Sequence, residues 1–73
     1  MMDTSVEDYF GKKAGAVWRA LKENGPMGIA GLKKKTGLAE RDAYAGLAWL
    51  AREEKIRIAG ERPMHYKFSL VEK

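Results

Sequence analysis

The 73-residue chain contains no cysteine, a single histidine and only two prolines. Without cysteine, disulfides and thiolate zinc sites are excluded, so a domain this short depends on packing for its stability, with or without oligomerisation. One imidazole makes neither a metal site nor a nucleophile and base pair, and we interpret His65 as structural. The sequence therefore predicts no catalytic centre, no metal, no cofactor and no small-molecule substrate.

Long apolar runs and a strong charge of one sign are also missing. No apolar run approaches the ~18 residues of a membrane span, and residues 1–5 do not resemble a signal peptide, so we expect a cytoplasmic protein with no membrane partner. The net charge is +4. Residues 1–25 carry four basic and four acidic side chains, whereas residues 26–73 carry ten and six. Any anion-binding face is therefore expected after residue 25.

A long helical pattern comes first. Thr4 and Glu7 have the spacing of a capping box, which predicts a helix start with Thr4 as the cap. Apolar residues then recur at a helical period, namely Val6, Phe10, Ala14, Val17 and Leu21, with Trp18 at the edge of the stripe as a further core residue. Asn24-Gly25-Pro26 predicts the end of this helix.

Two shorter helices are predicted next, joined by a tight turn. Residues 30–36 have the length of a two-turn helix with Leu32 inward, and Gly37 ends it with Leu38 buried in the turn. Residues 40–54 form a third helical pattern. Its core face contains Ala43, Gly46, Leu47 and Leu50, and its opposite face contains Arg41, Ala45, Ala48 and Arg52.

After Lys55 the apolar period changes from 3.6 to 2, which predicts strands at residues 56–58 and 66–70. Residues 60–64 combine glycine and proline, so the two strands are expected to form an antiparallel hairpin with a basic, mobile tip. The segment of residues 27–29 is too short for a strand of its own, but its β-branched residue, Ile29, lies between Gly28 and Gly31 and could add one bridge to this sheet. The predicted class is α+β.

Two helices with a glycine-containing turn, followed by a hairpin on the same core, are typical of winged helix-turn-helix domains. Across residues 9–70 the chain also resembles the small stand-alone winged helix-turn-helix proteins of bacteria and archaea, a family of unknown function. The matching segments are residues 14–18 (AGAVW), 32–38 (LKKKTGL) and 46–56 (GLAWLAREEKI). This resemblance implies one domain over residues 1–73, with three helices and a C-terminal wing of two or three antiparallel strands.

The pattern of Leu47, Leu50 and Ile56 is similar to the end of the recognition helix in winged-helix regulators. That resemblance implies a DNA-binding protein, a minor transcription regulator or architectural factor, with residues 40–54 in the major groove and the wing on the backbone. The predicted DNA contacts are basic or aromatic, namely Lys33, Lys34, Lys35, Arg41, Tyr44, Arg57, Arg62 and Lys67. The alternatives are a solvated surface for the lysines and the hairpin residues, and packing beside the wing for Tyr44.

Several features weaken sequence-specific reading and favour a second hypothesis. Ala39 stands where such domains usually have a capping Ser or Thr, and Glu40 and Asp42 oppose phosphate. Ala45 and Ala48 offer no hydrogen-bonding groups to base edges. The alternative is a protein-interaction or homodimerisation module in which Trp49, Ala45 and Ala48 contact a partner, although Trp49 could equally pack on the first helix or the hairpin.

Overall fold

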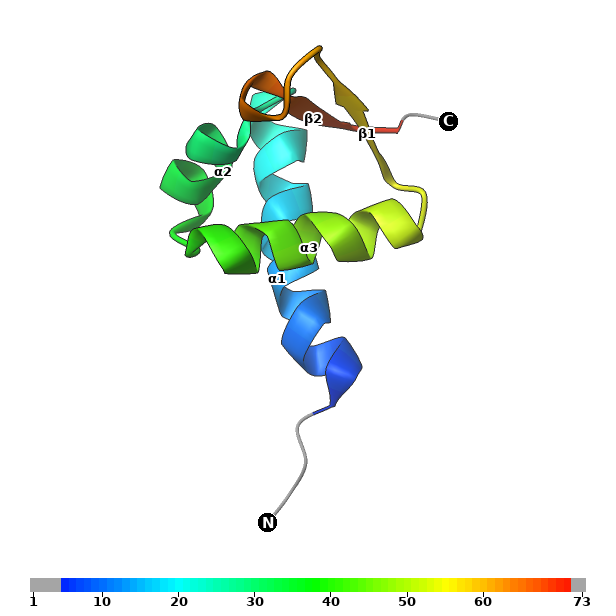
Figure 1. Cartoon of the computed structure of the whole chain (residues 1–73). Helices are drawn as coiled ribbons and strands as arrows, with labels where there is room; N and C mark the ends of the chain where they lie inside the picture. Colours follow the sequence, from blue (N-terminus) through cyan, green and yellow to red (C-terminus); the bar gives the residue numbers. More distant parts are fainter. Residues whose placement is uncertain (1–4, 72–73) are drawn as a thin grey trace.

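The computed structural model describes residues 5–71 as three helices and a small antiparallel sheet (Figure 1). The helices are α1 (Val6–Asn24), α2 (Ile29–Thr36) and α3 (Glu40–Arg52), and the strands are β1 (Ile56–Ala59) and β2 (Lys67–Leu70), with a 3₁₀ turn at Pro63–His65. The order and the α+β class agree with the sequence prediction.

Both ends of α1 are defined by local hydrogen bonds. The N-cap is Ser5, whose hydroxyl accepts the Asp8 N–H at 3.4 Å, so the cap lies one residue later than predicted. Thr4, the predicted cap, lies outside the described residues. Gly25 ends the helix as predicted, with φ of 79° and its N–H donating to the Leu21 carbonyl at 2.8 Å.

The most extensive contact between helices is the crossing of α3 over α1, visible at the centre of Figure 1. It depends on Gly46. A Cβ at this position would lie 2.7 Å from the Lys13 carbonyl oxygen and 2.9 Å from the carbonyl carbon, so any side chain would push the two helices apart. Val17, Leu47 and Leu50 fill the space around this crossing and are almost fully buried.

The turn between α2 and α3 is stabilised by the Thr36 hydroxyl. It donates to the Leu32 carbonyl at 2.6 Å and accepts the Leu38 N–H at 3.2 Å, and Gly37 takes the left-handed conformation with φ of 74°. Leu32 is fully buried and Leu38 packs against the core, as predicted. This turn holds α2 and α3 at the angle seen in Figure 1.

The hairpin closes the core with one aromatic side chain. Ile56 pairs with Leu70 and Ile58 pairs with Phe68, and Phe68 is only 6% exposed. Met27 exchanges two backbone hydrogen bonds with Phe68, at 3.0 and 2.7 Å. The predicted single bridge therefore exists, but it is formed by Met27 and not by Ile29, which is the first residue of α2. The sheet therefore connects the end of α1 to the end of α3.

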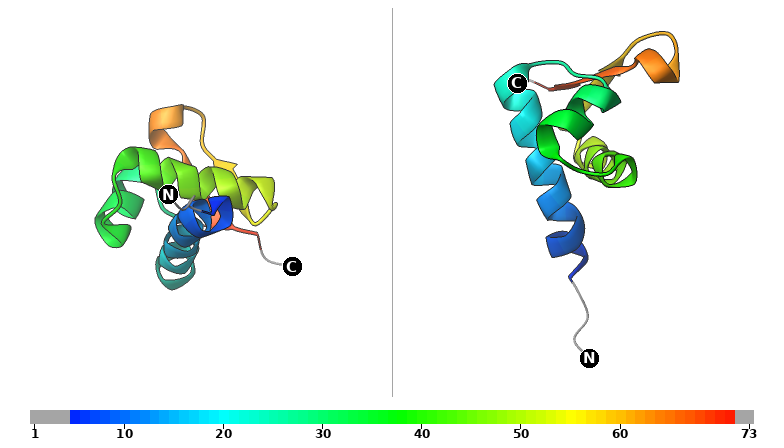
Figure 2. Two further views of the ribbon diagram at one scale, coloured as in Figure 1. Left: turned by 90° about the horizontal axis from the view of Figure 1, so that it is seen from below. Right: turned by 90° about the vertical axis from the view of Figure 1, so that its left-hand side faces the viewer.

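Some predicted core positions and boundaries are wrong. Val6 is 62% exposed because the first turns of α1 extend beyond α3 (Figure 2). Trp18, at the edge of the apolar stripe of α1, is 37% exposed. Ile58 is 54% exposed, although it shares the apolar face of the hairpin. The third helix ends at Arg52 rather than at residue 54, since Glu54 has a left-handed φ of 58° that turns the chain into β1.

Candidate nucleic-acid interface

The solvent-facing side of α3 is a narrow stripe of four residues, Arg41, Ala45, Ala48 and Arg52, which we call the α3 outer stripe. Arg41, Ala48 and Arg52 are exposed, and Ala45 is half-buried. The stripe faces outward because the opposite side of α3 is pressed against α1 at Gly46. Its two arginines are eleven positions apart, which corresponds to about 16 Å along a helix axis.

The acidic residues at the start of α3 are balanced by lysines from the other helices. Asp42 lies 3.4 Å from Lys13 of α1, and Glu40 lies 3.8 Å from Lys33 of α2. Lys13 is further fixed by the Tyr9 ring, whose centroid is 3.4 Å from its ammonium nitrogen. The repulsion of phosphate expected from Glu40 and Asp42 is therefore reduced, and Lys33 has an acidic neighbour.

The remaining lysines of the predicted cluster lie in the last turn of α2. Lys34 and Lys35 are exposed, and cations at a helix C-terminus are favoured by the helix dipole. Lys35 lies beside Arg19 of α1 in a shallow, polar depression. The end of α2 is thus a basic shoulder next to the α2–α3 turn.

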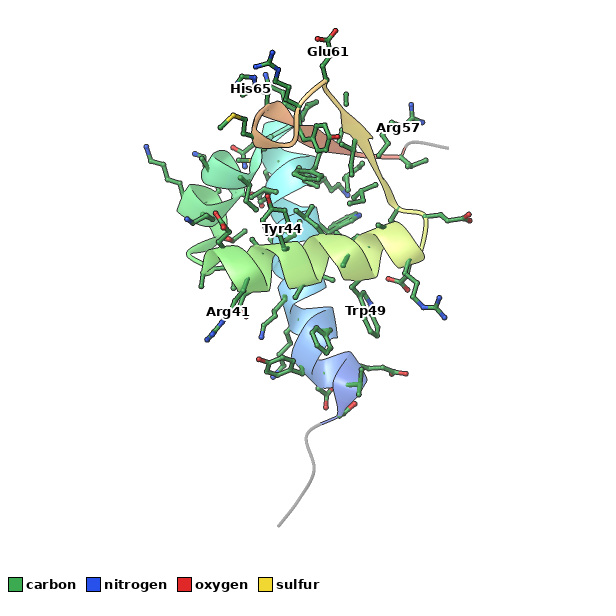
Figure 3. The ribbon with its side chains drawn as sticks, in the orientation of Figure 1. Arg41, Tyr44, Trp49, Arg57, Glu61 and His65 are labelled. Carbon is green, nitrogen blue, oxygen red and sulfur yellow. The ribbon has the colours of Figure 1, made fainter. Side chains whose placement is uncertain are left out.

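The DNA contacts predicted on the hairpin lie in two regions, the strands with Arg57 and Lys67 and the tip with Arg62. Arg57 pairs with Ser69, and Lys67 pairs with Ala59, so both basic residues alternate with the apolar pair of Ile58 and Phe68. Because neighbouring side chains of a strand point to opposite faces, Arg57 and Lys67 point away from α3. Figure 3 shows Arg57 directed outward from the hairpin and Glu61 at its tip. Arg62 is exposed beside that tip.

An apolar groove separates α3 from the hairpin. It has a volume of about 340 Å³, and its exposed walls are formed by Tyr44, Ala48 and Ala51 of α3 and by Ile58 and Tyr66 of the hairpin. Figure 3 shows Tyr44 pointing from α3 toward the hairpin. This direction agrees with the alternative prediction, in which Tyr44 packs beside the wing. The prediction did not identify this groove, although the alternation of Ile58, Tyr66 and Phe68 with basic residues was a signal for it.

Trp49 packs on α1. Its ring stacks on Phe10 with a centroid distance of 6.2 Å and an interplanar angle of 10°, and the side chain is half-buried. Figure 3 shows it on the side of α3 opposite to Tyr44. Of the two hypotheses for Trp49, this geometry agrees with the intramolecular one. A partner contact by Trp49, Ala45 and Ala48 stays a prediction.

The described residues show no metal site and no membrane-spanning helix. Within residues 5–71, no group of three His, Asp or Glu side chains is arranged to hold a metal ion, and His65 lies in the exposed 3₁₀ turn of the hairpin. No helix in this part of the chain has the length and apolarity needed to cross a membrane. The exposed basic residues around α3 and the apolar groove are therefore the features considered for binding a partner at α3.

The helix-turn-helix and the packed hairpin together define a winged helix-turn-helix domain. The chain belongs to the family described as winged helix-turn-helix domain (DUF2582), whose model matches residues 2–67. A comparison with curated proteins found no match. Among solved structures, the chain is similar to the solution structure of protein BT2368 from Bacteroides thetaiotaomicron, with a TM-score of 0.78, 29% sequence identity, and coverage of 90% of this chain and 79% of that one.

Proposed function

We propose that the protein binds double-stranded DNA through the α3 outer stripe, mainly by phosphate contacts and with weak sequence preference. The role would be that of a minor transcription regulator or an architectural factor. Winged helix-turn-helix domains often bind DNA by inserting this helix into the major groove. The fold supports the class of ligand, and the arrangement of charge on α3 supports the mode of binding.

The observation that carries the proposal is the composition of the α3 outer stripe. Two exposed arginines, Arg41 and Arg52, lie about 16 Å apart along the helix axis. On the stripe, only alanines lie between them. The major groove is about 12 Å wide, so arginines at this spacing can reach phosphates on both of its sides. The small side chains of Ala45 and Ala48 allow close approach and can contact thymine methyl groups, without hydrogen bonds to base edges.

Flanking cations extend this surface on two sides. Lys34 and Lys35 at the end of α2 lie where the first helix of a helix-turn-helix crosses the DNA backbone, and Arg62 lies at the hairpin tip. Arg57 and Lys67 point to the far face of the hairpin and would contribute only long-range attraction. The predicted contacts therefore separate into two sets. The near set contains Arg41, Lys34, Lys35 and Arg62, and the far set contains Arg57 and Lys67.

Fluorescence anisotropy of a labelled mixed-sequence duplex, titrated at several salt concentrations, tests the proposal. Affinity should fall steeply with salt, with a logarithmic slope of about −0.9 per phosphate contacted. The Arg41→Gln/Arg52→Gln double variant should weaken binding by at least about tenfold and reduce the slope by about 2. Exchanging several unrelated duplex sequences should change the affinity little.

The matched control is Arg57→Gln/Lys67→Gln, which removes the same charge from exposed positions on the face of the hairpin that points away from α3. It should retain most of the affinity, because its residues lie off the α3 outer stripe. Equal losses in both double variants would mean that net charge alone drives binding, and the assignment of the stripe would be wrong. Absence of binding at low salt would exclude the DNA proposal.

The apolar groove favours a second candidate, a protein-interaction module without nucleic-acid binding. Tyr44 and Ile58 are 44% and 54% exposed, and aromatic side chains in a concave apolar surface are common anchors for protein partners. The two candidates separate on the same titration. If the folded protein does not bind DNA at low salt, the result favours this groove as its principal functional surface.

A further inference from the structure

A second surface of the molecule lies along α1, and its residue types differ from those of the α3 outer stripe. Glu7, Gly11, Gly15, Trp18 and Lys22 fall within an arc of about 80° on this helix, at 100° per residue. We call this surface the α1 stripe. In the right-hand view of Figure 2, α1 forms one side of the molecule, with α2, α3 and the hairpin all placed toward the other.

The glycines of the α1 stripe have no explanation within one copy of the chain. A Cβ built at Gly11 or Gly15 would meet no heavy atom of the described residues within 4 Å, apart from the backbone of its own helix. Each glycine inside a helix costs about 0.5–1 kcal/mol relative to alanine. Alanine would therefore fit both positions and stabilise the helix.

Trp18 is the large apolar residue of this surface. It is 37% exposed, and the ammonium nitrogen of Lys22 lies 4.7 Å from its ring centroid. Two depressions flank Trp18, one beside Gly11, Gly15 and Trp49, and one beside Leu70 and Val71. A partner placed along α1 would thus cover an aromatic ring and the apolar walls of both depressions.

The α1 stripe is complementary to itself when reversed. In an antiparallel pair of α1 helices related by a two-fold axis near Gly15, Glu7 of one copy faces Lys22 of the other, and Gly11 faces Trp18. Each of these contacts then occurs twice, as a two-fold interface requires. The acidic residue is at the start of the stripe and the basic residue at its end, so the antiparallel arrangement pairs opposite charges, whereas a parallel one aligns like charges.

From this complementarity we propose that a second copy of the chain docks on the α1 stripe, with the two α1 helices antiparallel. The absence of a side chain at Gly11 is then explained, because the open space beside Gly11 receives the indole of the partner's Trp18. That indole would lie beside the Phe10 and Trp49 rings, which are stacked next to Gly11. Trp49 thereby takes part in dimerisation as a wall of the pocket. The α3 outer stripe stays free in such a dimer.

Charge reversal provides the test. Wild-type protein, studied by sedimentation velocity over micromolar to millimolar concentrations, should show a monomer–dimer equilibrium. Glu7→Lys and Lys22→Glu should each raise the dimer dissociation constant by about tenfold, because two opposite-charge pairs become like-charge pairs. The double variant Glu7→Lys/Lys22→Glu should restore dimerisation to near the wild-type level.

The double variant also separates dimerisation from the stability of the helix itself. Both substitutions oppose the helix dipole, so the double variant should be less stable than either single one when diluted to monomer. Recovered dimerisation together with reduced stability supports the proposal. A wild-type protein that stays monomeric at millimolar concentration overturns it, as does a dimer that none of the three variants affects.

A second readout is the emission of Trp18 in a Trp49→Phe background, which removes the other tryptophan while keeping an aromatic ring against Phe10. Dimerisation should bury the indole, so the emission should shift to shorter wavelength as concentration rises. Gly11→Gln, placed where the partner's Trp18 would sit, should abolish this shift with little effect on folding. A shift that persists in the Gly11→Gln protein would contradict the assigned contact.

Discussion

The two sides of α3 differ in how tightly they are packed. Toward α1, Gly46 lies so close to the Lys13 carbonyl that a Cβ would be 2.7 Å from its oxygen. Toward the hairpin, Tyr44 and Ile58 border an open groove of about 340 Å³. The helical crossing therefore fixes the position of α3, whereas the hairpin depends on a few anchoring side chains. The substitutions below compare these two sides.

The largest effect is expected at the hairpin anchor. Phe68→Ala should lower the free energy of unfolding by about 3–5 kcal/mol, because it empties the one buried aromatic site that connects the sheet to the core. Urea denaturation followed by circular dichroism measures this. Ile58→Ala on the paired strand should cost less than about 1 kcal/mol, since Ile58 is half exposed. Equal losses would mean that the groove is as tightly packed as the core.

At the helical crossing, Gly46→Ala should cost about 2–3 kcal/mol, because the added methyl group must displace the backbone of Lys13. The same denaturation experiment applies. A loss below about 0.5 kcal/mol would show that the two helices can separate easily, and the contrast between the two sides of α3 would disappear.

A smaller effect is expected for the lysine that connects α1 to the start of α3. Lys13→Met should cost about 1–1.5 kcal/mol by removing the ion pair with Asp42 and the contact with the Tyr9 ring. Lys55→Met, which breaks the more exposed pair with Glu53, is the control and should change stability by less than about 0.5 kcal/mol. If both variants behave alike, Lys13 has no special structural role.

The smallest effect is expected on the exposed flank of α1, and it is a gain. Gly15→Ala should raise the free energy of unfolding by about 0.5–1 kcal/mol, since alanine is the better helix former and the added methyl group enters open space. Thermal unfolding should be measured at low concentration, which disfavours self-association. A loss of stability instead would indicate an intramolecular contact at this flank.

The sequence predicted the elements of the fold well because their signals are local. The Asn24-Gly25-Pro26 stop, the glycine at position 37 and the change of apolar period after Lys55 each depend on neighbouring residues only. The exposure of Trp18 and Val6 could not be predicted in this way, because it depends on where α3 crosses α1. That crossing is set by the contact of Gly46 with Lys13, between residues far apart in the chain.

The candidate interface was less predictable for the same reason. The basic residues could be counted from the sequence, but not the pairing of Lys33 with Glu40 or of Lys13 with Asp42. Strand alternation places Arg57 and Lys67 on the face away from α3, and this orientation requires the register of the hairpin. Tyr44 points into the groove between α3 and the hairpin, so its direction could not be predicted without the position of the hairpin.

The most direct test of DNA binding by α3 is a titration of ¹⁵N-labelled protein with a short duplex at low salt, followed by backbone amide chemical shifts. We predict that the shifts of Arg41, Ala45, Ala48 and Arg52 change most, with smaller changes at Lys34, Lys35 and Arg62, and that added salt reverses them. Shifts confined to α1, or unchanged spectra at excess DNA, would contradict the proposed interface.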